Sequence, residues 1–540
     1  MKITTLRLLW IYFLFIVVLL GGTSCEPGND NQVKDATRIV ILTGDKSHPA
    51  TLHEYIKNAR LIKTMLDQAS NIENIETDIY YRGWPEDPSV LDDADLILTI
   101  SDGRDGPGGV DVPFLMDERM EIIQKQVDRG CGMMTFHFST FAPDKYGDQV
   151  LDWVGGYFDW QNDQGEREWY SDITFLDVQI ELPSPEHPVS RGVTPFKIVE
   201  EYYYDLRFRP EDPRFSAIVK VPELQAEHPD GQIVAWAIER EDGGRGFGTS
   251  LGHFYGNWKN EDYRKLLLNA IVWTAGLEVP GPGVETSFYD DKQVTKLLFN
   301  KDYKGLILTG NNYPGHKWEE TTPLLQEALE MNNKVHIDVS YNINDLFQYD
   351  LRDYDFLAFN YCNWEDPDPI WENAKTALEN YVEAGGGLMF IHFANGAFHF
   401  SLPDAGDSDW PYYRKLCRRV WNHNGQSTHD TYGSFSVHIA DGTHEITHGI
   451  PDFQVMDELY YNQEGEEFIH VLLASISNDT GKEEPQAWVY EINHPTGRNS
   501  RVFQTVLGHD TVSFKVPEFK EILSNAAIWL SKGSDRWNGL

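Results

Sequence analysis

GGGLMFIHF (Gly385–Phe393) decides the fold, because a glycine turn opens a short apolar run that ends in a histidine. A matching stretch, GCGMMTFHF (Gly130–Phe138), lies in the first half of the chain. A short apolar run bounded by glycine is typical of a buried parallel strand. The histidine then stands at the carboxyl end of the strand, where open α/β sheets bind their ligands.

These two stretches belong to a longer internal repeat, whose blocks follow one another in the same order in both halves. RIVILTG (Arg38–Gly44) recurs as KGLILTG (Lys304–Gly310), and TSLGH (Thr249–His253) recurs as TVLGH (Thr505–His509). HPVSRGVTPFKIVEEYY (His187–Tyr203) matches a stretch that begins at His444 without a gap. Repetition at a domain-length period predicts two tandem copies of one domain.

The repeat sets the domain boundaries that we expect. Copy one spans residues 37–277 and copy two spans residues 302–535. Residues 278–301 form a linker that opens in LEVPGPG, since proline and glycine interrupt both helix and strand. Within each copy, buried-strand patterns alternate with amphipathic helical patterns, as in TTPLLQEALE (Thr321–Glu330). This alternation predicts an α/β fold in which each copy is a doubly wound, mostly parallel sheet of the flavodoxin-like kind.

The net charge of the chain limits the kinds of partner that the protein can bind. The chain has 540 residues, with 45 Lys and Arg against 85 Asp and Glu, which gives a formal net charge of −40. Such a chain cannot neutralise a phosphate backbone or an anionic lipid surface, so nucleic acid and electrostatic membrane binding are excluded. A small-molecule partner remains, and the 16 Trp residues suit stacking on sugar rings.

The N-terminus reads as a targeting segment. Lys2 and Arg7 precede an apolar run from Leu8 to Leu20, which is shorter than the roughly 20 residues of a membrane span. Small residues then lead to Cys25. We expect residues 1–25 to be a lipoprotein signal peptide, with Cys25 as the lipidated residue and residues 26–36 as a tether. The expected location is the bacterial envelope, periplasmic or cell-surface, with the lipid anchor as the only membrane contact; an ordinary cleaved signal is the alternative.

Several side chains of copy two follow strands or lie on probable loop ends, and these are the candidate site residues. His392 follows GGGLMFI, and His509 follows a strand at Gly508, which permits a tight turn. Glu458 lies among Leu459, Tyr460 and Tyr461, where partial desolvation favours a general base. The further candidates are His316, Trp318, His429 and Asp510.

Copy one matches this set only in part. His137, Glu201 and His253 correspond to His392, Glu458 and His509. Copy one offers only His48 near the place of His316, has no counterpart of His429, and carries Phe254 in place of Asp510. We therefore expect copy two to hold the active site and copy one to be degenerate.

The chemistry of the candidate residues leaves alternatives open. Several histidines with a carboxylate suit a divalent metal ion, but no two of these candidate histidines stand at HxxxH or HxH spacing, and an acid/base pair without metal is equally admissible. No GxGxxG or GxxxxGK[ST] motif follows the first strands, so a nucleotide cofactor is not indicated. The strand-to-helix turn carries a histidine instead of Ser or Cys, which disfavours acyl-enzyme chemistry.

These blocks together resemble the ThuA-like (trehalose-utilisation) family, whose fold is similar to that of class I glutamine amidotransferases. The pieces that carry the resemblance are LILTGNNYPGHKW, GGGLMFIHF, PQAW (Pro485–Trp488) and GRNSRVFQTVLGHD (Gly497–Asp510). The family lacks the amidotransferase Cys at the turn, as do both copies here, so glutaminase activity is not implied. The resemblance implies a role in sugar catabolism, notably of 3-keto sugars and disaccharides.

The sequence thus predicts an envelope enzyme that acts on sugars or 3-keto-glycosides by elimination and hydration or by hydrolysis. We expect Glu458 or His392 to be the base and His509 the acid, with His316 and His429 orienting or polarising the substrate. Trp318 and Asp510 are expected to contact the carbohydrate. The alternative is a non-catalytic lipoprotein that binds glycans or a partner. Convergence of His316, His392, Glu458 and His509 in one place would favour the enzyme.

Overall fold

The computed structural model describes residues 36–103, 114, 117–160, 164–167, 169–403, 407–425, 427–495 and 497–533. The predicted signal peptide with Cys25, and the tether as far as residue 35, lie outside the described residues. Among the helices of the described part, none has the length and apolar character needed to cross a membrane.

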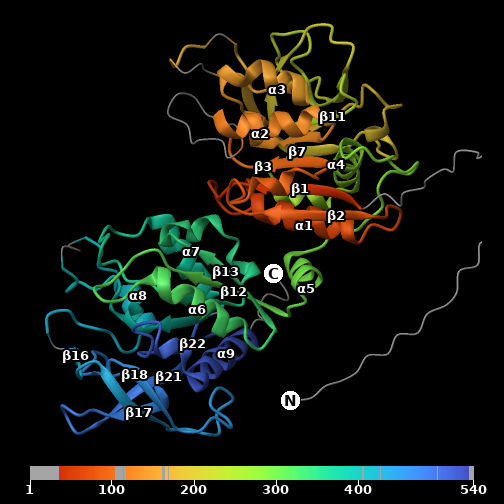
Figure 1. Ribbon diagram of the computed structural model, residues 1–540. Helices are drawn as coiled ribbons and strands as arrows, with labels where there is room; N and C mark the ends of the chain where they lie inside the picture. The colour runs from red at the N-terminus through yellow and green to blue at the C-terminus, as the bar shows by residue number, and fades with distance from the viewer. Residues whose placement is uncertain are drawn as a thin grey trace, which may run out of the picture. The chain divides into compact units, whose positions relative to one another are not determined.

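Copy one is built on a seven-stranded sheet, drawn from red to yellow-green in Figure 1. The first five strands in sheet order are parallel and the last two add antiparallel hydrogen bonds. In sheet order the strands are β2 (Ile75–Tyr80), β1 (Thr37–Thr43), β3 (Leu96–Ile100), β4 (Gly132–Phe136), β11 (Arg245–Thr249), β10 (Ile233–Glu239) and β9 (Phe215–Lys220).

Copy two repeats this arrangement in a nine-stranded sheet, drawn from green to blue. Its first five strands are again parallel, and the remaining four are antiparallel. In sheet order they are β13 (Val335–Ser340), β12 (Tyr303–Leu308), β14 (Phe356–Phe359), β15 (Gly387–Ile391), β22 (Asn499–Thr505), β21 (Glu483–Asn493), β20 (His470–Ile476), β17 (Gly433–Ile439) and β18 (Phe453–Asp457).

Helices cover both faces of each sheet, because the strands are apolar on both faces. In β1, Ile39 and Ile41 enter one core while Val40 and Leu42 enter the other. The first core of copy one contains side chains of α1 (Tyr55–Asp67) and α4 (Glu261–Thr274), and the second contains those of α2 (Asp117–Asp128) and α3 (Gly147–Val154). In copy two the corresponding helices are α6 (Trp318–Glu330) and α9 (Pro517–Ser531), opposite α7 (Glu372–Glu383) and α8 (Pro411–Leu416). The predicted α/β fold is confirmed.

Short two-stranded ladders sit beside the main sheets. In copy one, β6 (Asp172–Gln179) pairs with β7 (Lys197–Tyr204), and Leu176 stands opposite Glu200. In copy two the matching pair is β17 and β18, at the edge of the nine-stranded sheet, where Gly433 stands opposite Asp457. The remaining pairs are β5 (Gly156–Tyr157) with β8 (Arg207–Phe208), and β16 (Thr428–His429) with β19 (Tyr460–Tyr461).

The segment expected as a linker, residues 278–301, contains a helix, α5 (Asp291–Phe299). Asp290 caps it by accepting from the backbone N–H of Gln293, whose side chain accepts from the backbone of Asp290 in return. Only the Pro- and Gly-rich first half of the segment has the irregular backbone that its composition predicts.

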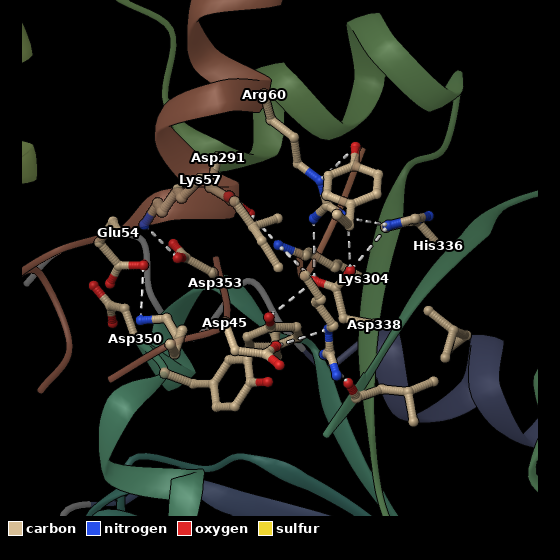
Figure 2. A pocket seen from close by; sticks show the side chains of 18 of the residues that line it. Asp45, Glu54, Lys57, Arg60, Asp291, Lys304, His336, Asp338, Asp350 and Asp353 are labelled. Atoms are coloured by element: carbon tan, nitrogen blue, oxygen red, sulfur yellow. Dashed lines mark hydrogen bonds and ion pairs between the residues drawn. The ribbon is translucent and has the colours of Figure 1, made fainter. Parts of the chain in front are cut away.

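A cavity of about 320 Å³ is lined by charged residues of both copies, as Figure 2 shows. Arg60 of α1 donates to both carboxylate oxygens of Asp338, at 2.9 and 3.2 Å, and Lys304 lies 3.3 Å from the same group. Burial by itself would raise the pKa of Asp338, but Arg60 and Lys304 hold it well below its ordinary value. The charged side chains that line this cavity form ion pairs with one another. We therefore interpret the cavity as part of an ion-pair network within the fold, and it is not the candidate site.

Candidate metal centre

Four candidate side chains of copy two meet at one point beyond the carboxyl ends of the parallel strands. They are His316, His392, Glu458 and His509, whose nearest ligand atoms all lie within 4.8 Å of one another. His392 follows β15, His509 follows β22, Glu458 follows β18, and His316 precedes α6. Residues far apart in sequence therefore converge where the parallel sheet places its ligands.

The backbone at this point is turned sharply. His392 has a φ of 46°, in the left-handed region that a residue with a side chain rarely adopts. Gly508, directly before His509, has a φ of 117°, as the sequence predicts for a tight turn at glycine. Sparsely populated backbone conformations of this kind cluster at functional sites, because the surrounding structure must hold them in place.

Hydrogen bonds outside the cluster determine which ring nitrogen of two histidines carries the proton. His392 Nδ1 lies 2.5 Å from the carbonyl oxygen of Val506, and His316 Nδ1 lies 2.8 Å from that of Pro314. A carbonyl oxygen only accepts, so both Nδ1 atoms are protonated and both Nε2 atoms present lone pairs. These two Nε2 atoms are 2.8 Å apart, although neither neutral ring has a proton to place between them.

Protonation of the two rings does not supply a hydrogen for the contact between His316 Nε2 and His392 Nε2. Burial, followed by the neighbouring His509, lowers the pKa of His316 to about 4. Burial and then His316 lower the pKa of His392 well below its ordinary value. Burial thus favours the neutral form of both rings. The Tyr460 hydroxyl lies 2.9 Å from His392 Nε2 and His509 Nδ1 lies 3.1 Å from His316 Nε2, and a cation held between the two lone pairs is a further arrangement that makes their contact favourable.

A carboxylate completes the cluster. Glu458 Oε2 lies 3.2 Å from His509 Nδ1 and 3.8 to 3.9 Å from the two Nε2 atoms. Burial alone would raise the pKa of Glu458, but its hydrogen bond with His509 lowers it. Neighbouring Asp457 accepts from the backbone N–H groups of Gly508 and His509, which fixes the turn that carries the fourth ligand.

The donor set suits a transition-metal ion. Three imidazole nitrogens and one carboxylate oxygen are ligands that Zn²⁺ prefers, and carbonyl-oriented rings are the usual outer shell of such sites. Ligands placed tetrahedrally at about 2.1 Å from Zn²⁺ stand roughly 3.4 Å apart. The measured separations of 2.8 to 3.9 Å bracket that value.

The other predicted residues lie around this centre or away from it. His429 Nε2 is 3.6 Å from Glu458 Oε1, and the side chain is 36% exposed, so it stands at the rim. Asp510 accepts a hydrogen bond of 2.7 Å from the hydroxyl of Tyr432. Trp318 packs on Tyr341 at 5.5 Å between ring centroids and is not one of the four clustered residues.

Further aromatic residues flank the centre: Trp364, which the sequence suggests for stacking on a sugar face, and Tyr313 and Trp421, which it does not single out. The ring of Tyr313 lies 4.9 Å from His316 and 4.7 Å from Trp364. Trp421 lies 4.5 Å from Tyr460 and 6.1 Å from His429. Tyr313 stands within the NNYPGH segment already quoted, but the place of Trp421 depends on a long loop whose path has no periodic signal.

The profile of the family described as ThuA, trehalose utilisation, matches residues 38–274 and again residues 304–530. The chain belongs to the ThuA family. The predicted resemblance and the tandem repeat are thereby confirmed, and the family connects this ThuA protein to carbohydrate utilisation.

The search of solved structures finds similar proteins at low identity. A protein described as ThuA-like from Parabacteroides merdae is 22% identical with a TM-score of 0.36, covering 43% of this chain and 90% of its own. One from Bacteroides uniformis is 17% identical with a TM-score of 0.31, covering 42% and 91%. A glutamine amidotransferase from Thermotoga maritima is 9% identical with a TM-score of 0.23, covering 38% and 74%. Among curated proteins, no match is found.

Proposed function

We propose that copy two is the catalytic half of an enzyme of carbohydrate catabolism, which acts on sugar glycosides or 3-keto-glycosides with the help of a divalent metal ion. The observation that carries this proposal is the 2.8 Å approach of two lone-pair nitrogens, His316 Nε2 and His392 Nε2, at the strand ends. Membership of the ThuA family supports a carbohydrate as the substrate. The aromatic rings around the centre are also suited to stacking on the apolar faces of sugars.

The geometry assigns roles that differ from those expected from the sequence. His392 is fully buried and both of its ring nitrogens are engaged, which suits a metal ligand better than a base. Glu458, His316 and His509 face the same point and complete the ligand set. His429 donates from Nδ1 to the carbonyl of Asp430, so its basic atom is Nε2, at the exposed rim.

In the proposed reaction, residues at the rim of the site transfer the proton and bind the substrate. A divalent ion held by His316, His392, Glu458 and His509 would supply a Lewis acid for the keto oxygen of the substrate. His429 Nε2 removes the C2 proton, the C2–H electron pair forms the C1–C2 double bond, and the C1–O bond breaks. The departing oxygen takes that proton back from His429, and addition of water to the double bond completes hydrolysis. Tyr432 and Asp510 hydrogen-bond the sugar hydroxyls.

Turnover of 3-keto-glycosides by the purified protein tests this proposal. Replacing the rim base, His429→Gln, is expected to lower kcat by about 10²- to 10⁴-fold while the metal stays bound. His448→Ala removes an exposed imidazole of copy two that is not one of the clustered ligands, and serves as the matched control. Full turnover in the His429 variant contradicts the role of His429. Absence of turnover on oxidised and unoxidised sugars alike favours a glycan-binding protein.

We also propose that the protein is exported and anchored to the envelope through a lipid on Cys25. The basic, apolar and small-residue segments before Cys25 support this proposal, which places the enzyme where external sugars arrive. Replacement of Cys25 by Ser should shift the protein from the membrane fraction to the soluble fraction, as measured by fractionation and blotting. Membrane retention of the Cys25→Ser protein argues against lipidation.

A further inference from the structure

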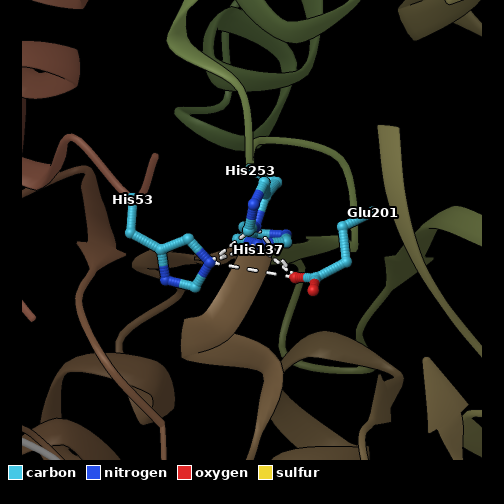
Figure 3. A group of neighbouring side chains, drawn as sticks. All are labelled: His53, His137, Glu201 and His253. Atoms are coloured by element: carbon cyan, nitrogen blue, oxygen red, sulfur yellow. Dashed lines mark hydrogen bonds and ion pairs between the residues drawn. The ribbon is translucent and has the colours of Figure 1, made fainter. Parts of the chain in front are cut away.

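Copy one contains a second converging cluster, of which the sequence comparison identified three residues but not the fourth, His53. His53, His137, His253 and Glu201 point toward one another, as Figure 3 shows, with ligand atoms within 4.8 Å of one another. The residue that matches His316 is therefore His53, and not the His48 expected from the sequence. His48 instead stacks on the His53 ring, with ring centroids 3.6 Å apart.

In copy one, too, hydrogen bonds with groups outside the cluster determine which ring nitrogen of two histidines carries the proton, although the partner groups are different. His137 Nδ1 lies 2.5 Å from the carbonyl oxygen of Ser250 and must donate to it. The Tyr55 hydroxyl donates to the carboxylate of Asp102, so its oxygen accepts from His53 Nδ1 at 2.9 Å. Both Nε2 atoms therefore carry lone pairs, and they lie 3.0 Å apart.

Further polar groups approach these two lone pairs. The Tyr203 hydroxyl lies 2.9 Å from His137 Nε2, and His253 Nδ1 lies 2.8 Å from His53 Nε2. Glu201 lies 2.9 Å from His253 Nδ1 and 3.4 Å from His137 Nε2 and brings a negative charge to the same point.

We propose that copy one binds a divalent transition-metal ion of its own through His53, His137, His253 and Glu201. Separations between ligand atoms of 2.8 to 3.8 Å bracket the roughly 3.4 Å expected for tetrahedral Zn²⁺. The proposal uses no residue of copy two, so it holds whether or not copy two is an enzyme.

The rim of this second site is apolar where that of copy two is polar. Ile173 pairs with Tyr203 as His429 pairs with Tyr460, so Ile173 occupies the place of His429. By the same strand register Phe175 occupies the place of Tyr432, and Phe254 follows His253 as Asp510 follows His509.

These apolar rings also cover the ligands. Phe254 and Phe175 lie 4.6 and 5.3 Å from the His253 ring. The site therefore encloses its ion and offers no polar rim group at these three places to bind a polyhydroxylated substrate. An enclosed ion with no open rim is the arrangement of a structural metal site.

Metal content of the full mature chain tests the proposal, with zinc counted by mass spectrometry after dialysis. We expect about two zinc ions per wild-type chain, and about one in the copy-two variant Glu458→Gln/His509→Ala. The matched copy-one variant Glu201→Gln/His253→Ala should also keep about one ion. Cobalt substituted into the copy-two variant should give the intense visible bands of a four-coordinate site, a signal that does not depend on turnover.

A copy-two variant that folds and holds no zinc or cobalt overturns the proposal, and leaves copy one with a hydrogen-bonded histidine network. This result does not require the copy-one variant to fold. If copy two binds no ion and the proposed function fails, the wild type should hold about one ion and the copy-one variant none. The two failures are therefore distinguishable.

Discussion

The two copies of this ThuA protein share a ligand set and differ in what surrounds it. Each has three histidines and a glutamate at the strand ends, and each orients a buried imidazole through a backbone carbonyl, from Ser250 in copy one and Val506 in copy two. The residues at the rims of the two sites differ: they are polar in copy two and apolar in copy one. Under the two proposals made above, binding an ion and recognising a substrate would be separable properties of one fold, since they would depend on different layers of the site.

The same difference appears in the accessibility of the ligands. The side chain of His509 is 15% exposed, whereas that of His253 is 5% exposed under its aromatic cover. Water and substrate would reach the more exposed centre of copy two more readily. With four protein ligands, an ion there would take a substrate oxygen as a fifth ligand, as catalytic zinc does when its coordination expands. We expect this contrast to govern three measurements.

Chelation should separate the copies most strongly. A chelator is expected to abolish turnover, with a loss of about 10³-fold or more that added Zn²⁺ restores, because the open site of copy two releases its ion first. The enclosed ion of copy one should leave at least about tenfold more slowly, because its release requires local opening of the apolar rim. Stopped-flow release of zinc to a fluorescent chelator measures both phases. A single phase, at equal rates in the two single-copy variants, contradicts the contrast.

Transplanting the rim of copy one into copy two should have an intermediate effect. Tyr432→Phe with Asp510→Phe removes the 2.7 Å hydrogen bond and both polar groups while leaving the four ligands in place. We expect kcat/KM for the sugar to fall by about 10- to 100-fold, since hydrogen bonds to the substrate are lost. Zinc content should remain at the wild-type level. Wild-type kinetics in this variant argue that the rim does not recognise the substrate.

The reverse transplant should have the smallest effect. Phe175→Tyr with Phe254→Asp recreates the polar pair in copy one, and the free energy of unfolding should change by no more than about 1 kcal/mol, because both positions are partly exposed. In a chain whose copy two carries Glu458→Gln, this change should not create turnover, since Ile173 still stands where a base is needed. Urea unfolding and the glycoside assay measure the two quantities. Turnover from that chain would show that the aromatic cover alone had silenced copy one.

The fold was more predictable than the site because its signals are periodic and local. Buried runs such as Ile39–Leu42 and Leu306–Leu308 specify strands by themselves, and their repetition specifies two copies. The match of His53 to His316 was not predictable, because each histidine lies in a loop where spacing from the preceding strand is free to change. The helix in residues 291–299 was missed because the Pro- and Gly-rich start of that segment dominated its interpretation.

By itself the sequence determined the α/β class, the duplication, and the residue types available at the strand ends, because apolar periodicity and repeated motifs are properties of the chain. Only the tertiary structure decided that the imidazole lone pairs of each copy face one another. That orientation depends on carbonyl oxygens more than a hundred positions away in sequence, as with His137 and Ser250 or His392 and Val506. A tautomer fixed by a distant backbone atom leaves no local pattern in the chain.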